Sequence, residues 1–195
     1  MKEALFYESL EQHKVKCNLC PHDCIIKPDR SGICGVRKNM EGKLYSLNYG
    51  VVTALGMDPI EKKPLYHFHP GRNILSVGSM GCNMKCFFCQ NWEISQVNDE
   101  DLPVKPTHSV DDIVKIATSR KDNIGVAYTY NEPVIYYEFM LDVAREMQKR
   151  GMKNVMVTNG FIHSKPLGEL IPLMDAFSVD LKGFTIRDHE AFDHA

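Results

Sequence analysis

The sequence lacks three features that would direct it to a membrane, to secretion or to nucleic acid. It has no apolar run near the roughly 18 residues that a membrane span needs. Its first residues, MKEALFYESLEQHKVK, mix Glu with Lys and contain no apolar signal core, so we expect a cytoplasmic protein. The formal net charge is −2, without the basic excess that is typical of nucleic-acid and membrane-surface binding. We therefore expect neither nucleic acid nor a membrane among its partners.

Disulfides are a further expected absence. The chain has seven cysteines, an odd number, and six of them lie in tight local clusters. Without a secretory signal, such clusters indicate metal ligation rather than a disulfide framework. The length of 195 residues, 44% of them hydrophobic, suffices for one full domain with a small appendage.

Beyond residue 70 the apolar pattern predicts strands alternating with helices. The predicted strands cover 73–79, 124–130, 154–160 and 176–183, and the predicted helices cover 109–117, 133–151 and 165–174. Ser109 and Asp112 form a capping-box pattern at the start of the first helix. This order is typical of parallel βαβ units, which build an open doubly wound sheet or a full or partial (β/α) barrel.

The two ends of the chain predict different structures. Residues 1–70 are rich in turn signals and have no long apolar periodicity, so we expect a small Cys-rich module there. Residues 71–195 supply four strands, whereas a barrel normally takes eight. The last residues, TIRDHEAFDHA, read as the start of a helix after the fourth strand. We therefore predict a partial (β/α) barrel in a fragment that lacks its C-terminal strands.

Polar stretches follow all four predicted strands. They are GCNMKCFFCQN at 81–91, YNEP at 130–133, TNG at 158–160 and DLKG at 180–183. Ligands gather at the C-terminal ends of parallel strands in both kinds of sheet. The four stretches therefore predict one site.

The first of these stretches carries three cysteines and no fourth alongside. Cys82, Cys86 and Cys89 have the spacing C-x3-C-x2-C. Thiolates are soft ligands that select iron–sulfur clusters, zinc or Cu(I), and structural zinc takes four ligands. Two interpretations stay open: a zinc loop completed by a His or an N-terminal Cys, or a [4Fe–4S] cluster with one iron free to bind a small molecule.

The motif resembles that of the radical S-adenosylmethionine (SAM) superfamily, with Phe88 at the aromatic position before the last Cys. SMGCNMKCFFCQNWEIS, followed by YTYNEP, VTNG and VDLKG, is similar to the group that contains pyruvate formate-lyase activating enzyme. With CPHDC…GICGVR and DPIEKKPLYHF added, the chain most resembles the radical SAM enzyme of the AmmeMemoRadiSam system. The resemblance covers essentially the whole chain.

The resemblance implies a cofactor set and a reaction. Cys82, Cys86 and Cys89 would ligate three irons of a [4Fe–4S] cluster, and SAM would chelate the fourth. Reductive cleavage of SAM would give a 5′-deoxyadenosyl radical that abstracts hydrogen from a substrate, such as a glycine of a partner protein or another protein or small molecule. A low-potential electron donor such as flavodoxin or ferredoxin would supply the electron.

Polar residues of the same stretches are predicted to contact SAM or substrate, and none is assigned a catalytic role. They are Asn91, Asn131, Glu132, Asn159, Asp180 and Lys182. Glu132 would accept the SAM ammonium where the family has Gly-Gly-Glu, although Tyr130 and Asn131 replace the glycines. The alternatives are that Glu132 favours a helix N-terminus, that TNG is an ordinary turn and that Lys182 is a solvated lysine.

Four further cysteines lie near the N-terminus with the spacing C-x2-C-x3-C-x9-C. They are Cys17, Cys20, Cys24 and Cys34. Four thiols suit a closed structural zinc site or a second iron–sulfur cluster that relays electrons, and His22 could replace one of them. With the three-Cys loop they also allow a rival function, a non-catalytic zinc protein with two metal modules that mediates interactions.

Overall fold

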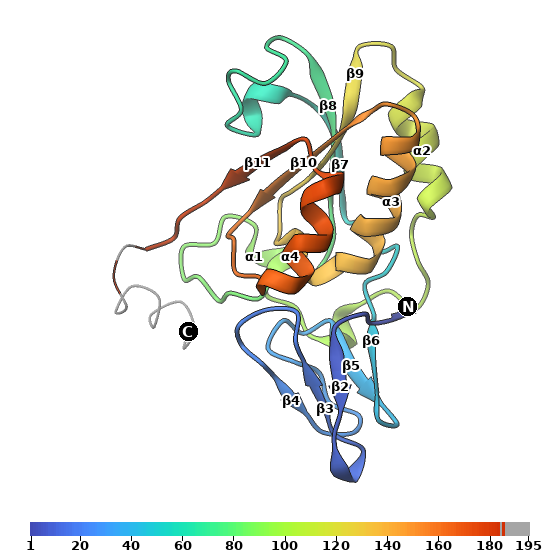
Figure 1. The fold of residues 1–195 in the computed structure, drawn as a ribbon, viewed down its shortest axis with the longest axis vertical. Helices are drawn as coiled ribbons and strands as arrows, with labels where there is room; N and C mark the ends of the chain where they lie inside the picture. Colours follow the sequence, from blue (N-terminus) through green and yellow to red (C-terminus); the bar gives the residue numbers. More distant parts are fainter. Residues whose placement is uncertain (184, 186–195) are drawn as a thin grey trace.

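The computed structural model describes residues 1–183 and 185 (Figure 1). Its largest element is a five-stranded sheet in the order β11–β10–β9–β8–β7. The strands are β7 (Ala54–Pro59), β8 (Asn73–Gly78), β9 (Asn123–Tyr128), β10 (Lys153–Thr158) and β11 (Ala176–Val179). Strands β8 to β11 run parallel and β7 is antiparallel to β8. The predicted α/β class with parallel strands is confirmed.

The helices lie between the parallel strands, as predicted. They are α1 (Trp92–Ser95), α2 (Val110–Thr118), α3 (Tyr137–Lys149) and α4 (Ser164–Leu170). Four 3₁₀ turns accompany the sheet: η2 (Ile60–Lys62), η3 (Asp99–Asp101), η4 (Pro133–Tyr136) and η5 (Ile171–Leu173). The capping box of α2 is present, with Asp112 N donating to Ser109 Oγ at 3.1 Å and Ser109 N to Asp112 Oδ2 at 2.9 Å. The helix predicted at the end of the chain lies outside the described residues.

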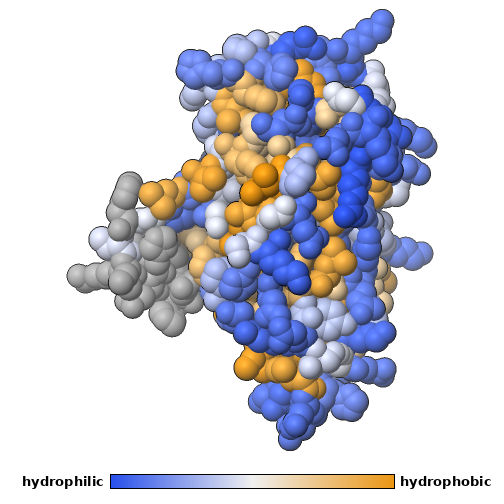
Figure 2. Space-filling view, in the orientation of Figure 1, coloured by the Kyte–Doolittle hydropathy of each residue, from blue (hydrophilic) through white to orange (hydrophobic). Residues whose placement is uncertain are grey.

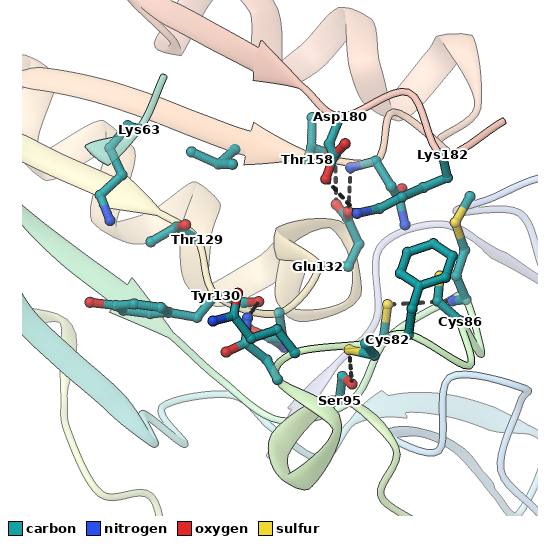
Figure 3. A pocket seen from close by; sticks show the side chains of 18 of the residues that line it. Lys63, Cys82, Cys86, Ser95, Thr129, Tyr130, Glu132, Thr158, Asp180 and Lys182 are labelled. Carbon is teal, nitrogen blue, oxygen red and sulfur yellow. Dashed lines mark hydrogen bonds and ion pairs between the residues drawn. The ribbon is translucent and has the colours of Figure 1, made fainter. Parts of the chain in front are cut away.

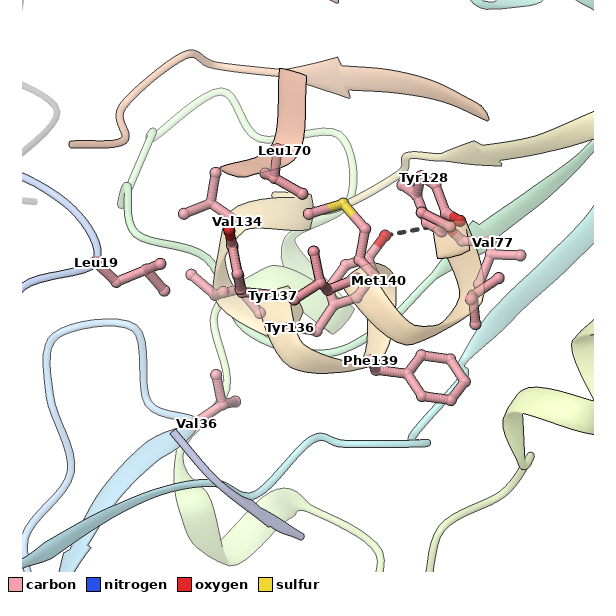
Figure 4. Packing of buried hydrophobic residues seen from close by; sticks show 14 of the residues in the cluster. Leu19, Val36, Val77, Tyr128, Val134, Tyr136, Tyr137, Phe139, Met140 and Leu170 are labelled. Atoms are coloured by element: carbon pink, nitrogen blue, oxygen red, sulfur yellow. Dashed lines mark hydrogen bonds between the residues drawn. The ribbon is translucent and has the colours of Figure 1, made fainter. Parts of the chain in front are cut away.

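The main core fills the face of the sheet that the helices cover. Side chains at alternate strand positions point to opposite faces, and those on this face pack against α2, α3 and α4 (Figure 4): Leu75, Val77, Val126, Tyr128 and Met156. The hydroxyl of Tyr136 donates to the carbonyl of Val77 at 3.2 Å, which joins η4 to β8. On the opposite face, the described residues form a smaller cluster: Ile60, Ile74, Ala127 and Val155.

The N-terminal residues, predicted as irregular, form two small antiparallel sheets. One has the order β1 (Lys2–Glu3), β6 (Lys43–Ser46), β5 (Arg37–Met40), and the other β2 (Tyr7–Ser9), β3 (Val15–Cys17), β4 (Ile25–Ile26). A 3₁₀ turn, η1 (Glu11–His13), joins β2 to β3. Strand β7 pairs along its whole length with β8, so the main sheet begins at residue 54. The division into a module of residues 1–70 and a barrel stays a prediction.

A buried ion pair fixes the N-terminal strands against α3. Arg37 on β5 donates from Nη1 to Glu138 Oε2 at 3.0 Å and from Nη2 to Oε1 at 2.8 Å. Leu5 N adds a bond to Glu138 Oε1 at 3.0 Å. Burial would raise the pKa of Glu138, but the charge and hydrogen bonds of Arg37 bring it below its ordinary value. Breaking such a buried pair is costly, so this contact secures the small sheets to the large one.

The surface is mostly polar, with apolar residues gathered beside α4 and β11 (Figure 2). Val179 and Leu181, at the end of β11, are exposed. Within the described part of the chain, β11 has one strand neighbour and forms an edge of the sheet. None of the helices in residues 1–183 and 185 has both the length and the apolar character to cross a membrane.

Candidate functional site

A cavity of about 710 Å³ opens at the carboxyl ends of the parallel strands (Figure 3). Its lining includes all nine residues that were predicted for the cluster and its ligands: Cys82, Cys86, Cys89, Asn91, Asn131, Glu132, Asn159, Asp180 and Lys182. The four stretches that carry them follow different strands and meet because parallel strands present their carboxyl ends at one edge. The structure therefore brings together all nine side chains that we predicted for the cluster and its ligands.

The three-Cys loop leaves β8 through a glycine that no other residue can replace without strain. Gly81 has φ +90, and a Cβ on it would lie 2.7 Å from Val36 Cγ1. Asn131 holds this turn, accepting from Ser79 N at 2.9 Å and donating to Gly81 O at 2.8 Å. Asn131 lines the cavity as predicted, but both ends of its amide bind the backbone, so its role in the structure is to position the loop.

Two thiols of this loop, those of Cys82 and Cys89, have polar neighbours. Met84 N donates to Cys82 Sγ at 3.4 Å, and Cys89 Sγ lies 3.1 Å from Ser95 Oγ. Burial, and to a smaller extent the charge of Glu132, raise the pKa of Cys82 to about 12. Burial also raises the pKa of Cys86. Both shifts favour the protonated thiols of Cys82 and Cys86, and a bound metal cation would favour their thiolates.

As the side chains stand, no group of three or more His, Cys, Asp or Glu in residues 1–183 and 185 is arranged around a single metal ion. A cubane [4Fe–4S] cluster requires a different arrangement of ligands. Each thiolate binds a separate iron, so the sulfurs do not converge on one point. Three thiols along one wall of a large cavity meet that demand. The fourth iron would have no protein ligand from this loop.

Glu132 lies deep in the cavity and is 4% exposed. Its Oε1 accepts from Thr158 Oγ1 at 2.7 Å and from Val134 N at 3.0 Å, and its Oε2 accepts from Asn159 N at 2.8 Å. The hydrogen bond from Val134 N caps η4, so Glu132 also has the role at a helix N-terminus that the sequence allowed as an alternative. A carboxylate has about four acceptor positions, which leaves one on Oε2 for a ligand. Burial raises the pKa of Glu132 above its ordinary value, although the three donors oppose this shift.

Two asparagines connect the strand ends across the cavity. Asn159 Nδ2 donates to Asn83 Oδ1 at 2.9 Å, which joins the end of β10 to the three-Cys loop. Asn159 Oδ1 accepts from Phe161 N at 2.9 Å. The TNG stretch therefore also forms a turn, which was the alternative interpretation of this motif. Asn91 Nδ2 donates to Tyr130 O at 2.6 Å, which joins α1 to the end of β9.

Asp180 and Lys182 reach the cavity from β11, which ends at Val179, earlier than the predicted residue 183. The two side chains form an ion pair with each other. The Lys182 ammonium also lies 5.9 Å from the ring centroid of Phe88, above the three-Cys loop. Lys182 is therefore partly buried at the mouth of the site and not a fully solvated lysine.

The cavity wall opposite the cysteines contains residues that were not predicted from the sequence. Asp58 Oδ2 accepts from Lys63 Nζ at 2.9 Å, from Ser76 Oγ at 2.8 Å and from the hydroxyl of Tyr130 at 3.0 Å. Lys63 is 4% exposed and lies 4.9 Å from the ring centroid of Tyr130. The alternation of apolar Leu55 and Met57 with Gly and Asp was the signal for β7 that could have placed Asp58 here.

Tyr130 stands at a position where the family that the sequence resembles has glycine. Its φ is +74, a conformation that glycine adopts freely and a bulky residue rarely does. The hydrogen bonds of its hydroxyl to Asp58 and of its carbonyl to Asn91 hold it there. Tyr130 therefore takes a backbone conformation that favours glycine, and these two hydrogen bonds stabilise it.

The four N-terminal cysteines lie around a second, much smaller cavity of about 20 Å³. Its other lining residues include Leu19, Ile26, Arg37 and Ile135. His22 also lines it, but its Nε2 is hydrogen-bonded to the carbonyl of Asn83 at 2.6 Å. The structure thus brings all four predicted thiols together, at a site separate from the large cavity.

Comparison with known proteins identifies relatives for most of the chain. The sequence model of the Radical SAM superfamily matches residues 76–191. An uncharacterized protein of Methanocaldococcus jannaschii is 46% identical over 183 residues, which are 94% of this chain and 54% of that protein. The pyruvate formate-lyase 1-activating enzyme of Escherichia coli K12 is 27% identical over 122 residues, 56% of this chain and 46% of the enzyme.

A 7-carboxy-7-deazaguanine synthase of Halobacterium salinarum is 31% identical over 87 residues, 45% of this chain and 32% of the enzyme. Each match thus covers about half, or less, of the relative's own length.

Proposed function

The chain belongs to the radical SAM superfamily, and on that premise we propose that its large cavity binds a [4Fe–4S] cluster on Cys82, Cys86 and Cys89 with SAM beside it. The observation that carries the proposal is the convergence of nine predicted residues from four strand ends on one cavity. Its volume of about 710 Å³ lies in the range of ordinary small-molecule and cofactor sites.

The residues present fit the cluster and an ionic ligand. Three thiols on one wall can ligate three irons, and the donors at Met84 N and Ser95 would hydrogen-bond the coordinated sulfurs. Glu132 keeps one acceptor position open toward the cavity, where the ammonium of SAM would satisfy a buried carboxylate. When bound, the cluster would supply one electron to the SAM sulfonium, which gives a 5′-deoxyadenosyl radical that abstracts hydrogen from the substrate.

The remaining residues orient the ligand and shape the site. Asn131 and Asn159 hold the three-Cys loop against the ends of β9 and β10, so the thiols and Glu132 keep one relative placement. Lys182, paired with Asp180, supplies a cation at the mouth that would attract a carboxylate or another anionic group. We assign none of these side chains a proton-transfer step.

We further infer that the sheet is part of a (β/α) barrel. Strands β8 to β11 are neighbours in chain order, whereas a doubly wound sheet reverses its strand order at a switch point. The core with the helices lies on one face and the cavity at the strand ends, which agrees with barrel geometry.

The substrate is proposed at the level of its class. Phe87 is 79% exposed and Trp92 is 61% exposed, both beside residues of the cavity wall, and such aromatic residues are enriched at protein interfaces. A protein substrate, including a glycyl-radical partner, is therefore our first candidate, and a flavodoxin or ferredoxin is the candidate electron donor. We place the reaction in the cytoplasm, where thiols stay reduced. The narrower assignment to the AmmeMemoRadiSam system rests on resemblance alone.

Anaerobic reconstitution tests the function. We expect brown protein whose visible absorbance bleaches with dithionite, and 5′-deoxyadenosine when SAM is added under reducing conditions. Cys86→Ala should lose iron, colour and deoxyadenosine together. Colourless protein that binds zinc at Cys82, Cys86 and Cys89 would establish the rival non-catalytic zinc protein, which the comparisons do not favour. A brown protein that binds SAM but makes no deoxyadenosine would limit this chain to cofactor binding.

A further inference from the structure

We propose that Cys17, Cys20, Cys24 and Cys34 bind a single zinc ion in a closed site that braces the three-Cys loop. The four thiols line one cavity at the base of the small sheets, away from the residues that line the large cavity. This inference concerns a separate metal and does not depend on radical chemistry.

Two turns present the four thiols from different segments. Cys17 ends β3, and its N donates to Cys24 O at 3.0 Å across the hairpin. Cys20 begins the turn between them, which Asp23 N closes on Cys20 O at 3.2 Å. Cys34 lies in a second turn, which Gly35 N closes on Gly32 O at 2.9 Å. Two Cys-bearing turns on either side of one metal ion are the usual arrangement of a tetrathiolate zinc site.

The size of the cavity favours one ion over a cluster. Its volume is about 20 Å³, whereas a water molecule needs at least about 10–15 Å³ on the same measure. A body the size of one water or one metal ion fits, and a cubane of four irons and four sulfides does not. Apolar Leu19, Ile26 and Ile135, all buried, complete the wall.

A buried donor in this wall points to a negatively charged occupant. Arg37 is 2% exposed and its Nη1 and Nη2 bind Glu138, but its Nε has no hydrogen-bond partner among the described residues. Arg37 lines the cavity with the four cysteines. Metal-bound thiolates keep negative charge and accept N–H bonds, so a zinc tetrathiolate would supply the partner that Nε lacks. Four protonated thiols would be poorer acceptors.

The four thiols line the cavity without yet enclosing an ion. Binding has to draw the two turns together, and we expect the metal to stabilise them. His22, between Cys20 and Cys24, binds the carbonyl of Asn83 at 2.6 Å. Asn83 in turn donates to Phe161 O at 2.8 Å and accepts from Asn159 at 2.9 Å. A metal at these turns would therefore steady the segment that carries Cys82 and Cys86.

Two variants of the full chain separate the two sites. The triple variant Cys82→Ala/Cys86→Ala/Cys89→Ala removes the thiols of the large cavity, and Cys20→Ala/Cys24→Ala removes half of the small site. Both are produced with zinc and iron supplied and assayed by elemental analysis. We expect about one zinc per chain and no iron in the triple variant. We expect no zinc in the double variant.

Cobalt provides a readout that does not require the double variant to fold. The triple variant, stripped of zinc and loaded with Co²⁺, should show the intense thiolate-to-cobalt absorption of a tetrahedral four-thiolate site. Chelation should lower its melting temperature. Folded triple variant that binds neither zinc nor cobalt would overturn the proposal. So would about four irons per chain with a brown colour, which would indicate a second cluster, or zinc retained by a folded double variant.

Discussion

The two cysteine sites differ in how completely the protein surrounds them. Three thiols lie on one wall of a cavity of about 710 Å³, whereas four thiols line a cavity of about 20 Å³. Structural metal sites are closed by protein ligands, and reactive ones keep a position open. The number of thiols and the volume of the cavity agree at each site, and both support the proposed reactive site in the large cavity and the proposed structural site in the small one.

The residues around the thiols also differ between the two sites. Around the large cavity stand ionic side chains, including Glu132, Asp58, Lys63 and Lys182, which can bind a charged ligand. Around the small one the wall is mostly apolar, and its one charged residue, Arg37, is paired with Glu138.

The largest expected effect is the loss of iron and of activity from a variant of the large cavity that retains its zinc. Cys86→Ala should reduce iron content and deoxyadenosine production to background while zinc stays at the level of the unaltered chain, because only the large cavity loses a ligand. Elemental analysis and chromatography of the reaction products measure these quantities. Loss of both metals from folded Cys86→Ala would show that the two sites are not independent.

Arg37→Met should lower the free energy of unfolding by about 3–5 kcal/mol, because it leaves the Glu138 carboxylate buried without its partner. Chemical denaturation of the reconstituted protein measures the loss. The double variant Arg37→Met/Glu138→Leu should regain much of it, since no unpaired charge remains buried. The exposed pair of Arg120 and Asp122 is the control, and Arg120→Met should show no comparable loss. Equal effects of the two single variants would contradict the assigned burial of the Arg37 pair.

Glu132→Gln should weaken SAM binding by about 10- to 100-fold, which corresponds to about 1.4–2.8 kcal/mol. The amide keeps the size of the side chain but loses the charge that faces the ammonium. Equilibrium binding on iron-loaded protein measures the change, and iron content should stay constant. Glu169→Gln, on the exposed side of α4, is the matched control. Unchanged affinity in Glu132→Gln would remove Glu132 from the binding site.

The affinity for SAM should fall as the pH is lowered through the pKa of Glu132, which burial raises above its ordinary value of 4.5. Protonation neutralises the carboxylate, so SAM binding is strongest above this pKa and weakens below it. Titrations at several pH values measure the dependence, and Glu132→Gln should flatten it. A pH dependence that persists unchanged in this variant would assign the titration to another group.

The smallest effect is expected at the mouth of the large cavity. Lys182→Met should weaken SAM or substrate binding only severalfold, because its ammonium is already paired with Asp180, whose side chain is 58% exposed. The difference between the variant and the unaltered chain should shrink at high salt, since exposed charges are screened. A loss as large as that of Glu132→Gln would show that Lys182 contacts the ligand directly.

The sequence predicted the four parallel strands β8 to β11 and the helices α2, α3 and α4, because their signals are local. The strand at 73–78, the capping box of Ser109 and the three-Cys spacing depend on residues close in the chain. The polar strand ends could be assigned to one site because parallel strands share an edge. Strand β7 was not predicted, since its alternation of Leu55 and Met57 with Gly56 and Asp58 is short and its pairing with β8 depends on a distant partner.

For the same reason the wall of Asp58 and Lys63 was missed, and Asn131 was assigned to the ligand although its amide holds Gly81. Hydrogen-bond partners far apart in sequence become visible only when the strands are registered against each other. The two cavity sizes likewise follow from packing and have no signature in residue spacing.

Mössbauer spectroscopy of protein reconstituted with ⁵⁷Fe, with and without SAM, tests the open site most directly. One iron in four should change its spectrum when SAM is added, in the unaltered chain and in Cys20→Ala/Cys24→Ala alike. If all four irons keep their spectrum in the presence of saturating SAM, the cluster has no free coordination position, and the distinction between an open and a closed cysteine site is wrong.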